Sequence, residues 1–183
     1  MPPKQRINRE MILEGAFSVF CREGMQNINA RSVARELSCS TQPIFSYYSG
    51  MAELKREIEE KAYQRFQEMV GPALEAEDPL KDACTRYLRF AAEEPMLFQH
   101  MFIQTTRAAE SMESHNRIPG GLDHRVAAVY GMSEDAALTL CLTLSAYTHG
   151  MAAILATGVF PMTCDYAIKR MEGVLERERT ALN

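Results

Sequence analysis

The chain has 183 residues, of which 46% are apolar and 24% are charged, so it can bury a core of ordinary size. No apolar run approaches the roughly 18 residues that a membrane-spanning helix needs, and the charged N-terminus is not followed by an apolar segment of the secretory kind. We therefore expect a cytoplasmic protein.

Motifs for metal binding and catalysis are not evident. The five cysteines and four histidines lack the spacing of a disulfide framework or of a metal site. The chain also has no GxSxG motif, no glycine-rich phosphate loop and no recognisable pair of catalytic carboxylates. We expect no cofactor, no metal site and no catalytic residues. An enzyme is the first alternative, and a metal assay would test it.

The predicted elements are helical along the whole chain, because apolar residues recur with the period of an amphipathic helix. In the N-terminal part they are a helix between Asn8 and Gly24, a short helix at about 30–37 capped by Asn29, a turn at Ser38-Cys39, and a helix at about 41–47 capped by Ser40. Two helices joined by so short a turn, after a third helix, predict a helix-turn-helix arrangement.

The remaining helices are longer and more apolar. They are a helix at about 51–70 ended by Gly71-Pro72, one from Asp78-Pro79 towards Pro95, a buried helical segment at 96–104, a short helix ending at Gly131 after a loop at 109–120, an apolar helix at about 134–157 capped by Ser133, and a final helix at about 164–181. We predict an all-α protein of about nine helices, with one domain at residues 1–50 and a second at 51–183.

The charge is unevenly distributed between these domains. Residues 1–58 carry eight basic and six acidic side chains, a net charge of +2, whereas residues 59–183 carry −6. A basic end on an acidic body is typical of a protein whose basic end binds nucleic acid.

The second helix of the helix-turn-helix has the first turn that DNA reading requires. Ser40, Thr41 and Gln42 can each donate and accept hydrogen bonds to phosphates or base edges. Pro43 is tolerated in a first turn, where the backbone N–H has no intrahelical partner. Ile44 is predicted to pack against the preceding helix, and Phe45 to face either the core or the DNA sugars.

The run AFSVFCREGMQNINARSVARELSCSTQPIFSYYSGMAELKREI, residues 16–58, resembles the N-terminal DNA-binding domain of TetR-family transcriptional regulators. That family shows a helix ending in phenylalanine and glycine, a capped helix of xxIA type, and a segment of the form GVSxGTLYxHFxSKExLL. The matching positions here are Phe20, Gly24, Asn29, Val33-Ala34, Ser40, Phe45, Tyr47-Tyr48 and Leu54.

The chain departs from the family pattern at three positions. Ser38 stands at the turn where the family has glycine, Gln42 replaces a small residue, and Met51 replaces the usual lysine, so one expected phosphate contact is missing. Lys55 or Arg56 is a possible substitute. The residues predicted to contact DNA are Lys4, Arg6, Asn29, Arg31, Ser40, Thr41, Gln42, Pro43, Phe45, Tyr47, Tyr48 and Lys55.

The resemblance implies that the C-terminal domain binds an effector and dimerises. The pair His149-Gly150 is similar to part of a Trp-xxx-His-Gly signature found in one subgroup, although this chain has no tryptophan. Aromatic and thioether side chains suggest a pocket for a small hydrophobic or amphipathic effector. The candidate effector-binding residues are Tyr87, Phe90, Phe98, His100, Met101, Phe102, Tyr147, His149 and Met151.

The predicted function is that of a ligand-released repressor. A homodimer, formed through the helices near 134–157 and 164–181, would present two reading helices to a palindromic operator. An effector that prefers a different separation of these helices would shift the protein away from DNA. Two further alternatives are a redox sensor at Cys39 and a helical protein that binds a partner other than DNA.

Overall fold

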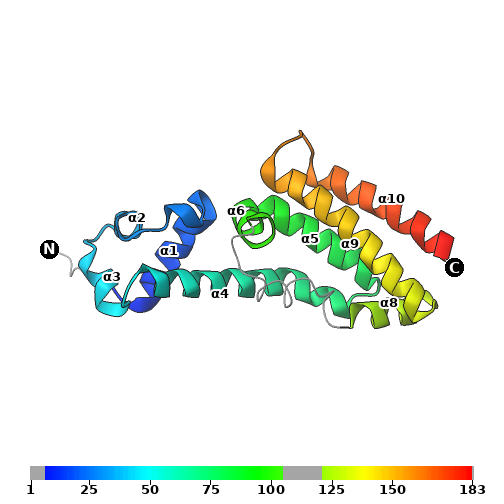
Figure 1. The fold of residues 1–183 in the computed structure, drawn as a ribbon, viewed down its shortest axis with the longest axis horizontal. Helices are drawn as coiled ribbons and strands as arrows, with labels where there is room; N and C mark the ends of the chain where they lie inside the picture. The colour runs from blue at the N-terminus through cyan, green and yellow to red at the C-terminus, as the bar shows by residue number, and fades with distance from the viewer. Residues whose placement is uncertain (1–6, 105–120, 183) are drawn as a thin grey trace. The chain divides into compact units, whose positions relative to one another are not determined.

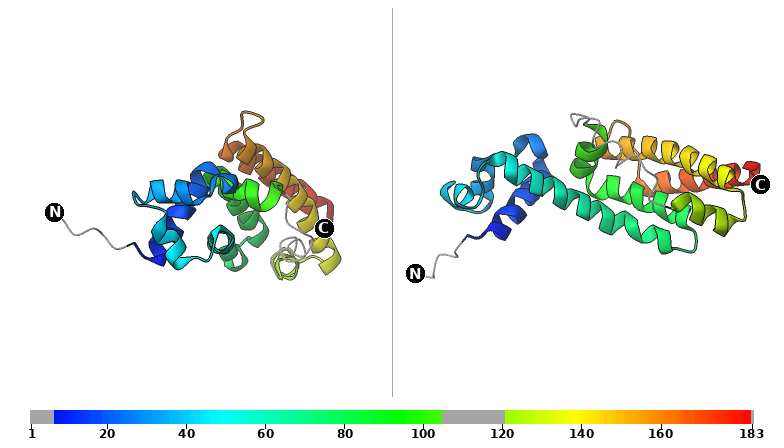
Figure 2. Two further views of the ribbon diagram at one scale, coloured as in Figure 1. Left: turned by 60° about the vertical axis from the view of Figure 1, so that its left-hand side comes forward. Right: turned by 60° about the horizontal axis from the view of Figure 1, so that its bottom comes forward.

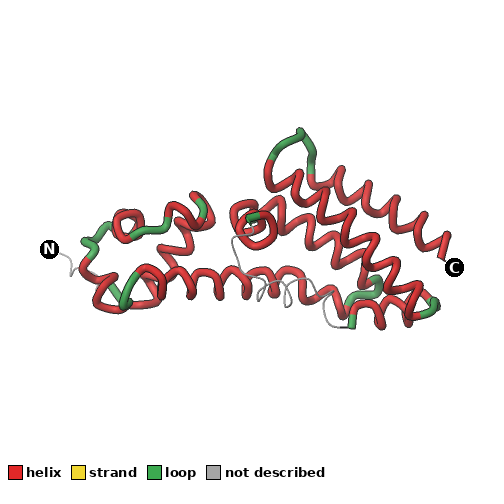
Figure 3. Tube along the Cα trace, in the orientation of Figure 1, coloured by secondary structure: helices red, strands yellow, loops and turns green. Residues whose placement is uncertain are grey.

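The computed structural model describes residues 7–104 and 121–182. Within these residues it has nine α-helices and no strand, as the sequence predicts (Figure 3). The helices are α1 (Arg9–Glu23), α2 (Ala30–Glu36), α3 (Gln42–Tyr47), α4 (Met51–Val70), α5 (Pro79–Glu93), α6 (Pro95–Phe98), α8 (Leu122–Tyr130), α9 (Glu134–Thr157) and α10 (Cys164–Leu182). The loop expected at 109–120 lies outside the described residues.

The chain folds as two compact units, Met1–Arg65 and Phe66–Asn183. Helix α4 is continuous and passes from the first unit into the second (Figure 1). The boundary therefore falls within α4, whereas the sequence analysis placed it before this helix, at residue 50.

The first unit is built on buried apolar side chains from α1, α2, α3 and the start of α4. Ile12, Phe20, Val33, Ile44 and Leu54 have no accessible surface. The predicted caps of the first two helices are confirmed. The Asn8 side chain accepts from the Met11 backbone N–H at 2.8 Å, and the Asn29 side chain accepts from the N–H groups of Arg31 and Ser32, both at 3.0 Å.

The turn between α2 and α3 is a Schellman motif with a serine at the left-handed position. The Cys39 backbone N–H donates to the Ala34 carbonyl at 2.9 Å, and the Ser38 N–H donates to the Arg35 carbonyl at 3.1 Å. Ser38 has φ of 50° and is the only non-glycine residue with positive φ in the described parts of the chain. The missing turn glycine noted in the sequence thus coincides with a strained backbone position.

The second unit is organised around α9. Helices α5, α8 and α10 all contact α9, and α5, α9 and α10 lie side by side in two views (Figures 1 and 2). Leu140 and Leu144 on α9 are fully buried, whereas Leu138 and Leu142 are 40% and 55% exposed. One side of α9 is therefore core, and the opposite side is an uncovered apolar surface.

Two expectations about the apolar segments need correction. By length and composition alone α9 could cross a membrane, so the statement that no segment approaches the necessary length was too strict; the packing of α9 against three helices is that of a core helix. The 96–104 segment is helical through α6 and a following π-helical turn, Gln99–Ile103, but only its first part is buried, and Ile103 and Gln104 are exposed.

Replacing Ser38 with glycine is predicted to stabilise the first unit. Glycine adopts a φ of 50° without a Cβ clash, so Ser38→Gly should raise the free energy of unfolding by up to about 1 kcal/mol, because the steric relief exceeds the cost of the extra conformational entropy that glycine gives the unfolded chain. Urea unfolding measures the change. Ser40→Gly is the matched control and should not stabilise the protein, because Ser40 does not have a positive φ. An equal or lower stability for Ser38→Gly would contradict the prediction.

Candidate nucleic-acid interface

Helix α3 presents an exposed polar and aromatic surface. Ser40 and Gln42 are exposed, and Phe45 and Tyr47 are 54% and 39% exposed, so Phe45 faces solvent rather than the core. Thr41 and Pro43 are half-buried at the start of the helix. The prediction that Ser40 caps this helix is wrong, because Thr41 takes the cap position and no side chain bonds to the free N–H groups.

Tyr48 does not belong to this exposed surface, which corrects its place among the DNA contacts. It is 2% exposed, and its hydroxyl donates to Glu57 Oε2 at 2.8 Å. Burial and this hydrogen bond raise the pKa of Tyr48 to about 12. The side chain braces the end of α3 against α4 and has no free hydroxyl for a phosphate.

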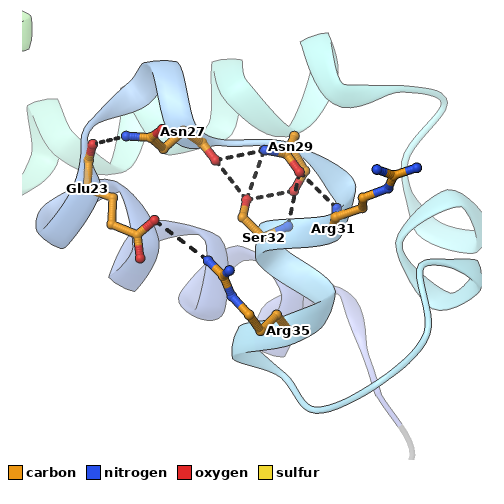
Figure 4. A pocket seen from close by; sticks show the side chains of 6 residues that line it. All are labelled: Glu23, Asn27, Asn29, Arg31, Ser32 and Arg35. Carbon is orange, nitrogen blue, oxygen red and sulfur yellow. Dashed lines mark hydrogen bonds and ion pairs between the residues drawn. The ribbon is translucent and has the colours of Figure 1, made fainter.

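A polar groove of about 370 Å³ lies beside the N-terminus of α2 (Figure 4). Asn29 and Ser32 form a reciprocal capping box there: the Asn29 side chain accepts from the Ser32 N–H, and the Asn29 N–H donates to Ser32 Oγ at 3.1 Å. Asn29 is therefore a structural cap first, with its side-chain amide also donating to the Asn27 carbonyl at 3.1 Å.

Two arginines one turn apart border this groove. The Arg31 guanidinium extends away from the capping box, whereas Arg35 points towards Glu23, 3.8 Å away (Figure 4). Both arginines are exposed. Arg31 was predicted from the sequence and Arg35 was not, although its position on the same face of α2 could have shown it. Lys55 is half-buried on α4, and Lys4 and Arg6 lie outside the described residues.

Arg9, the first residue of α1, connects three helices of this unit. Its Nη1 donates to the Tyr47 carbonyl at 3.1 Å, and its Nη2 donates to Glu53 Oε1 at 2.9 Å and to Glu57. The guanidinium also lies over the Tyr48 ring, 4.5 Å from its centroid. The pKa of Arg9 is raised, mainly by Glu57 and then by Glu53, so its charge is fixed.

A second cation ties α1 to α4 away from α3. Lys61 on α4 pairs with Glu14 on α1 and lies 5.2 Å from the centroid of the Phe17 ring. This contact resembles that of Arg9 in chemistry, because each combines an ion pair with a cation–π contact. It differs because Lys61 makes no contact with the reading helix.

Within the second unit, the residues expected to bind an effector divide between two places. Tyr87, Phe90, Phe98 and Phe102 pack edge-to-face or tilted with one another, with ring centroids 5.1–6.4 Å apart, and Phe66 of α4 joins them through Tyr87, Phe90 and Phe102. The Tyr87 hydroxyl is 3.0 Å from His149 Nδ1, and burial raises the pKa of Tyr87. These rings, which we call the aromatic cluster, pack directly against one another. His100 and Met101 are half-buried on the neighbouring π-helical turn.

Tyr147 and Met151 line a different surface, an open groove of about 430 Å³ near the end of α9. The other lining residues are Ile154, Phe160, Pro161, Met162, Tyr166 and Arg170. Phe160 and Tyr166 are 64% and 55% exposed. Among the described residues, no three histidine, cysteine or carboxylate side chains form a set that could hold a metal ion.

Comparison with known protein families identifies the second unit. Residues 80–172 match the family described as tetracyclin repressor-like, C-terminal domain, which covers just over half of the chain. The match includes all the candidate effector-binding residues, from Tyr87 to Met151. The chain belongs to the TetR family. The first unit supplies the helix-turn-helix that transcriptional regulators of this family use to bind DNA.

Solved structures agree with this assignment at the level of the fold. A TetR-like transcriptional regulator from Rhodococcus sp. RHA1 is 19% identical, with a TM-score of 0.67 over 94% of this chain and 97% of its own. The regulator SCO7222, a TetR protein from Streptomyces coelicolor, is 15% identical, with a TM-score of 0.59 over 97% of this chain and 100% of its own. Comparison with curated protein sequences gives no match.

The sequence analysis missed two residues that connect α4 to its surroundings in this TetR protein, Arg9 and Phe66. Arg9 contacts residues 38, 44 and 48 positions away, and no local pattern reports such contacts. Phe66 lies on an amphipathic helix where an aromatic residue at the apolar face is ordinary core. The fold places Arg9 between α1, α3 and α4, and Phe66 in the aromatic cluster.

Ionised Glu53 should make the free energy of unfolding of the TetR protein decrease at acidic pH. Its pKa is lowered to about 2, first by the Ser49 backbone N–H, then by the Ser49 hydroxyl and by Arg9. A lowered folded-state pKa stabilises the protein above the unfolded value of about 4.3, and this contribution is lost as the pH falls further. Glu53→Gln should therefore be less stable than the wild type at neutral pH, and the difference should shrink below about pH 4.

Urea unfolding at neutral pH and near pH 3 measures this difference. Glu60→Gln, an exposed glutamate on the same helix, is the control and should leave the acid dependence unchanged. A stability difference between Glu53→Gln and the wild type that stays constant from pH 7 down to about 3 would contradict the assignment.

Proposed function

We propose that this protein is a ligand-released repressor that binds a palindromic operator as a homodimer. The observation that carries the proposal is the exposed surface of α3, where Gln42, Phe45 and Tyr47 stand on a TetR fold. These side chains combine an amide, a phenol and an apolar ring on one exposed helix, and such a surface suits base edges, phosphates and sugars of DNA.

Each side chain on this surface suits a different part of DNA. The Gln42 amide can bond in two places to an adenine edge in the major groove. Phe45 has no hydroxyl, so it makes apolar contact with a thymine methyl group or a sugar. Tyr47 donates its hydroxyl to a phosphate. Ser40, Thr41 and Pro43 approach the DNA backbone at the start of the helix, and Arg31 and Lys55 add positive charge in the same unit.

The homodimer is supported by the uncovered side of α9. Leu138 and Leu142 are exposed one turn apart, and the exposed glycines Gly150 on α9 and Gly173 on α10 have open space where a Cβ would be. Exposed apolar side chains and glycines without neighbours on these two helices leave room for a second copy to pack. A two-fold axis through these helices would present two copies of α3 to the two halves of one palindrome.

The effector is proposed to act through the aromatic cluster, because this cluster contacts α4. Phe66 packs against Tyr87, Phe90 and Phe102, with centroid distances of 6.2, 5.2 and 5.2 Å. A hydrophobic or amphipathic molecule that enters between these rings would displace Phe66, and the Tyr87–His149 pair offers it a polar anchor. A coupling of about 1–3 kcal/mol between this site and DNA is sufficient for release.

Selection of genomic fragments by the purified protein at near-physiological salt tests the DNA-binding proposal. We expect one palindromic site. Gln42→Ala should lose about 1–3 kcal/mol of discrimination at one base pair in each half-site. Arg31→Ala should instead weaken binding to all sequences and lower the salt dependence by about one counterion per half-site.

Arg125→Ala is the control, because it removes an exposed arginine on α8, in the second unit. It should change neither the base-pair discrimination nor the salt dependence of binding. A folded protein that recovers no specific site, with an affinity insensitive to salt, would refute DNA binding and favour a different partner.

Replacing Leu142 with aspartate should convert the dimer to a monomer. Leu142 is 55% exposed in the single chain, so the charge costs little there but would be buried without a partner in the proposed interface. Sedimentation equilibrium measures the mass. Val129→Asp on α8, where Val129 is 39% exposed, is the matched control and should remain dimeric. A dimeric Leu142→Asp protein would place the interface elsewhere.

A further inference from the structure

Helix α3 has few contacts of its own to fix its position. Ile44 is its only buried side chain, and the helix has no side-chain cap. Six residues are far below the length at which a helix is stable alone. The orientation of the exposed Gln42 and Tyr47 side chains therefore depends on how the two ends of α3 are held.

The C-terminal end of α3 is held by Arg9. The guanidinium donates to the carbonyl of Tyr47, the last residue of α3, and stacks on the ring of Tyr48, the next residue. Its other nitrogen donates to Glu53 and Glu57, which lie one turn apart on α4. The guanidinium of Arg9 thus contacts the end of α3 and the first two turns of α4, and Arg9 itself is the first residue of α1.

Tyr48 and Ser49 close the same network from the α3 side. Tyr48 donates to Glu57 Oε2, and the Ser49 N–H and hydroxyl both donate to Glu53 Oε2 at 2.8 Å. Each carboxylate therefore receives Arg9 on one oxygen and the residues after α3 on the other. Tyr48 and Ser49 are therefore held by Glu57 and Glu53, and both of these glutamates also bind Arg9.

The geometry requires arginine rather than any cation. Arginine has five donors in a fixed plane, so it can serve a carbonyl and two carboxylates and still stack on a ring. Lysine keeps the charge but has a single nitrogen that cannot reach all these groups while lying flat on Tyr48. Because both glutamates already neutralise Arg9, it is poorly suited to contact a phosphate.

We infer that Arg9 is a positioning residue for DNA reading, which orients α3 through the Tyr47 carbonyl and the Tyr48 ring without touching DNA. The inference rests on the proposed DNA-binding function for its DNA readout. A second readout, hydrogen exchange along α3, is independent of DNA.

The experiment compares Arg9→Lys with Lys61→Ala. Arg9→Lys keeps the positive charge but loses the planar fork that reaches the Tyr47 carbonyl and stacks on Tyr48, so it releases the end of α3. Lys61→Ala removes an ion pair and a cation–π contact between α1 and α4 and leaves the contacts at the end of α3 in place. On the operator recovered by selection, Arg9→Lys should bind at least about tenfold more weakly, while its non-specific DNA affinity and its salt dependence stay close to wild type. Lys61→Ala should keep operator affinity within about threefold.

Amide hydrogen exchange on the free proteins gives the second result. The Tyr48 N–H, which donates to the Ile44 carbonyl at 3.0 Å, should exchange at least about fivefold faster in Arg9→Lys and at the wild-type rate in Lys61→Ala. Tyr48→Phe, which removes only the hydroxyl that Glu57 accepts, should show a smaller change in the same direction. It provides a test if Arg9→Lys does not fold.

Three outcomes overturn the inference. Unchanged exchange at Tyr48 in a folded Arg9→Lys protein and in Tyr48→Phe would show that Arg9 does not hold α3. A salt dependence lowered by about one counterion per half-site would make Arg9 a phosphate contact instead. An equal loss of operator affinity in Lys61→Ala would reduce the effect to general stability. If the wild type binds no operator, the proposed function fails, and the exchange result still decides the role of Arg9.

Discussion

Helix α3 cannot hold its own position, and the first unit is arranged around that constraint. Helix α3 has six residues, one buried side chain and no side-chain cap, so its conformation depends on neighbours. Ile44 fixes its middle in the core, and Arg9 with Tyr48 fixes its end. The turn before it is fixed by the two Schellman hydrogen bonds around Ser38. Because its anchors are few and separate, the polar side chains of α3 are left free to face outward.

The second unit meets a different constraint, because α9 is apolar on both sides. Leu140 and Leu144 complete the core with α5, α8 and α10, and this packing accounts for only one side of the helix. Leu138 and Leu142 remain on the other side with the bare backbone of Gly150. The composition that lets α9 pass as a membrane span is the same composition that a core helix with a second apolar interface requires.

The sequence predicted the local features well and the long-range ones poorly, for a physical reason. Helix caps such as Asn8, Asn29 and Ser133 use contacts two or three residues away, so their pattern is visible in the chain. The roles of Tyr47 and Tyr48 were not separable, because adjacent aromatic residues differ only in which face of the fold they meet. The split of the effector candidates between the aromatic cluster and the groove near Met151 depends on helix packing that no local spacing encodes.

Helix α4 gives the proposed effector response a physical requirement. Glu53 and Glu57, which hold Arg9 and the residues after α3, lie near its start, and Phe66, which joins the aromatic cluster, lies thirteen residues after Glu53. Displacement of Phe66 can reach α3 only if α4 moves as one rigid helix and if the contacts at its start are stronger than those at its end. The charged network of Arg9 meets the second condition, because rings that touch only by edges and faces repack more readily than a guanidinium bound to three acceptors. In the proposed response, a ligand rearranges the aromatic cluster and leaves the Arg9 network intact, so that α3 moves together with α4.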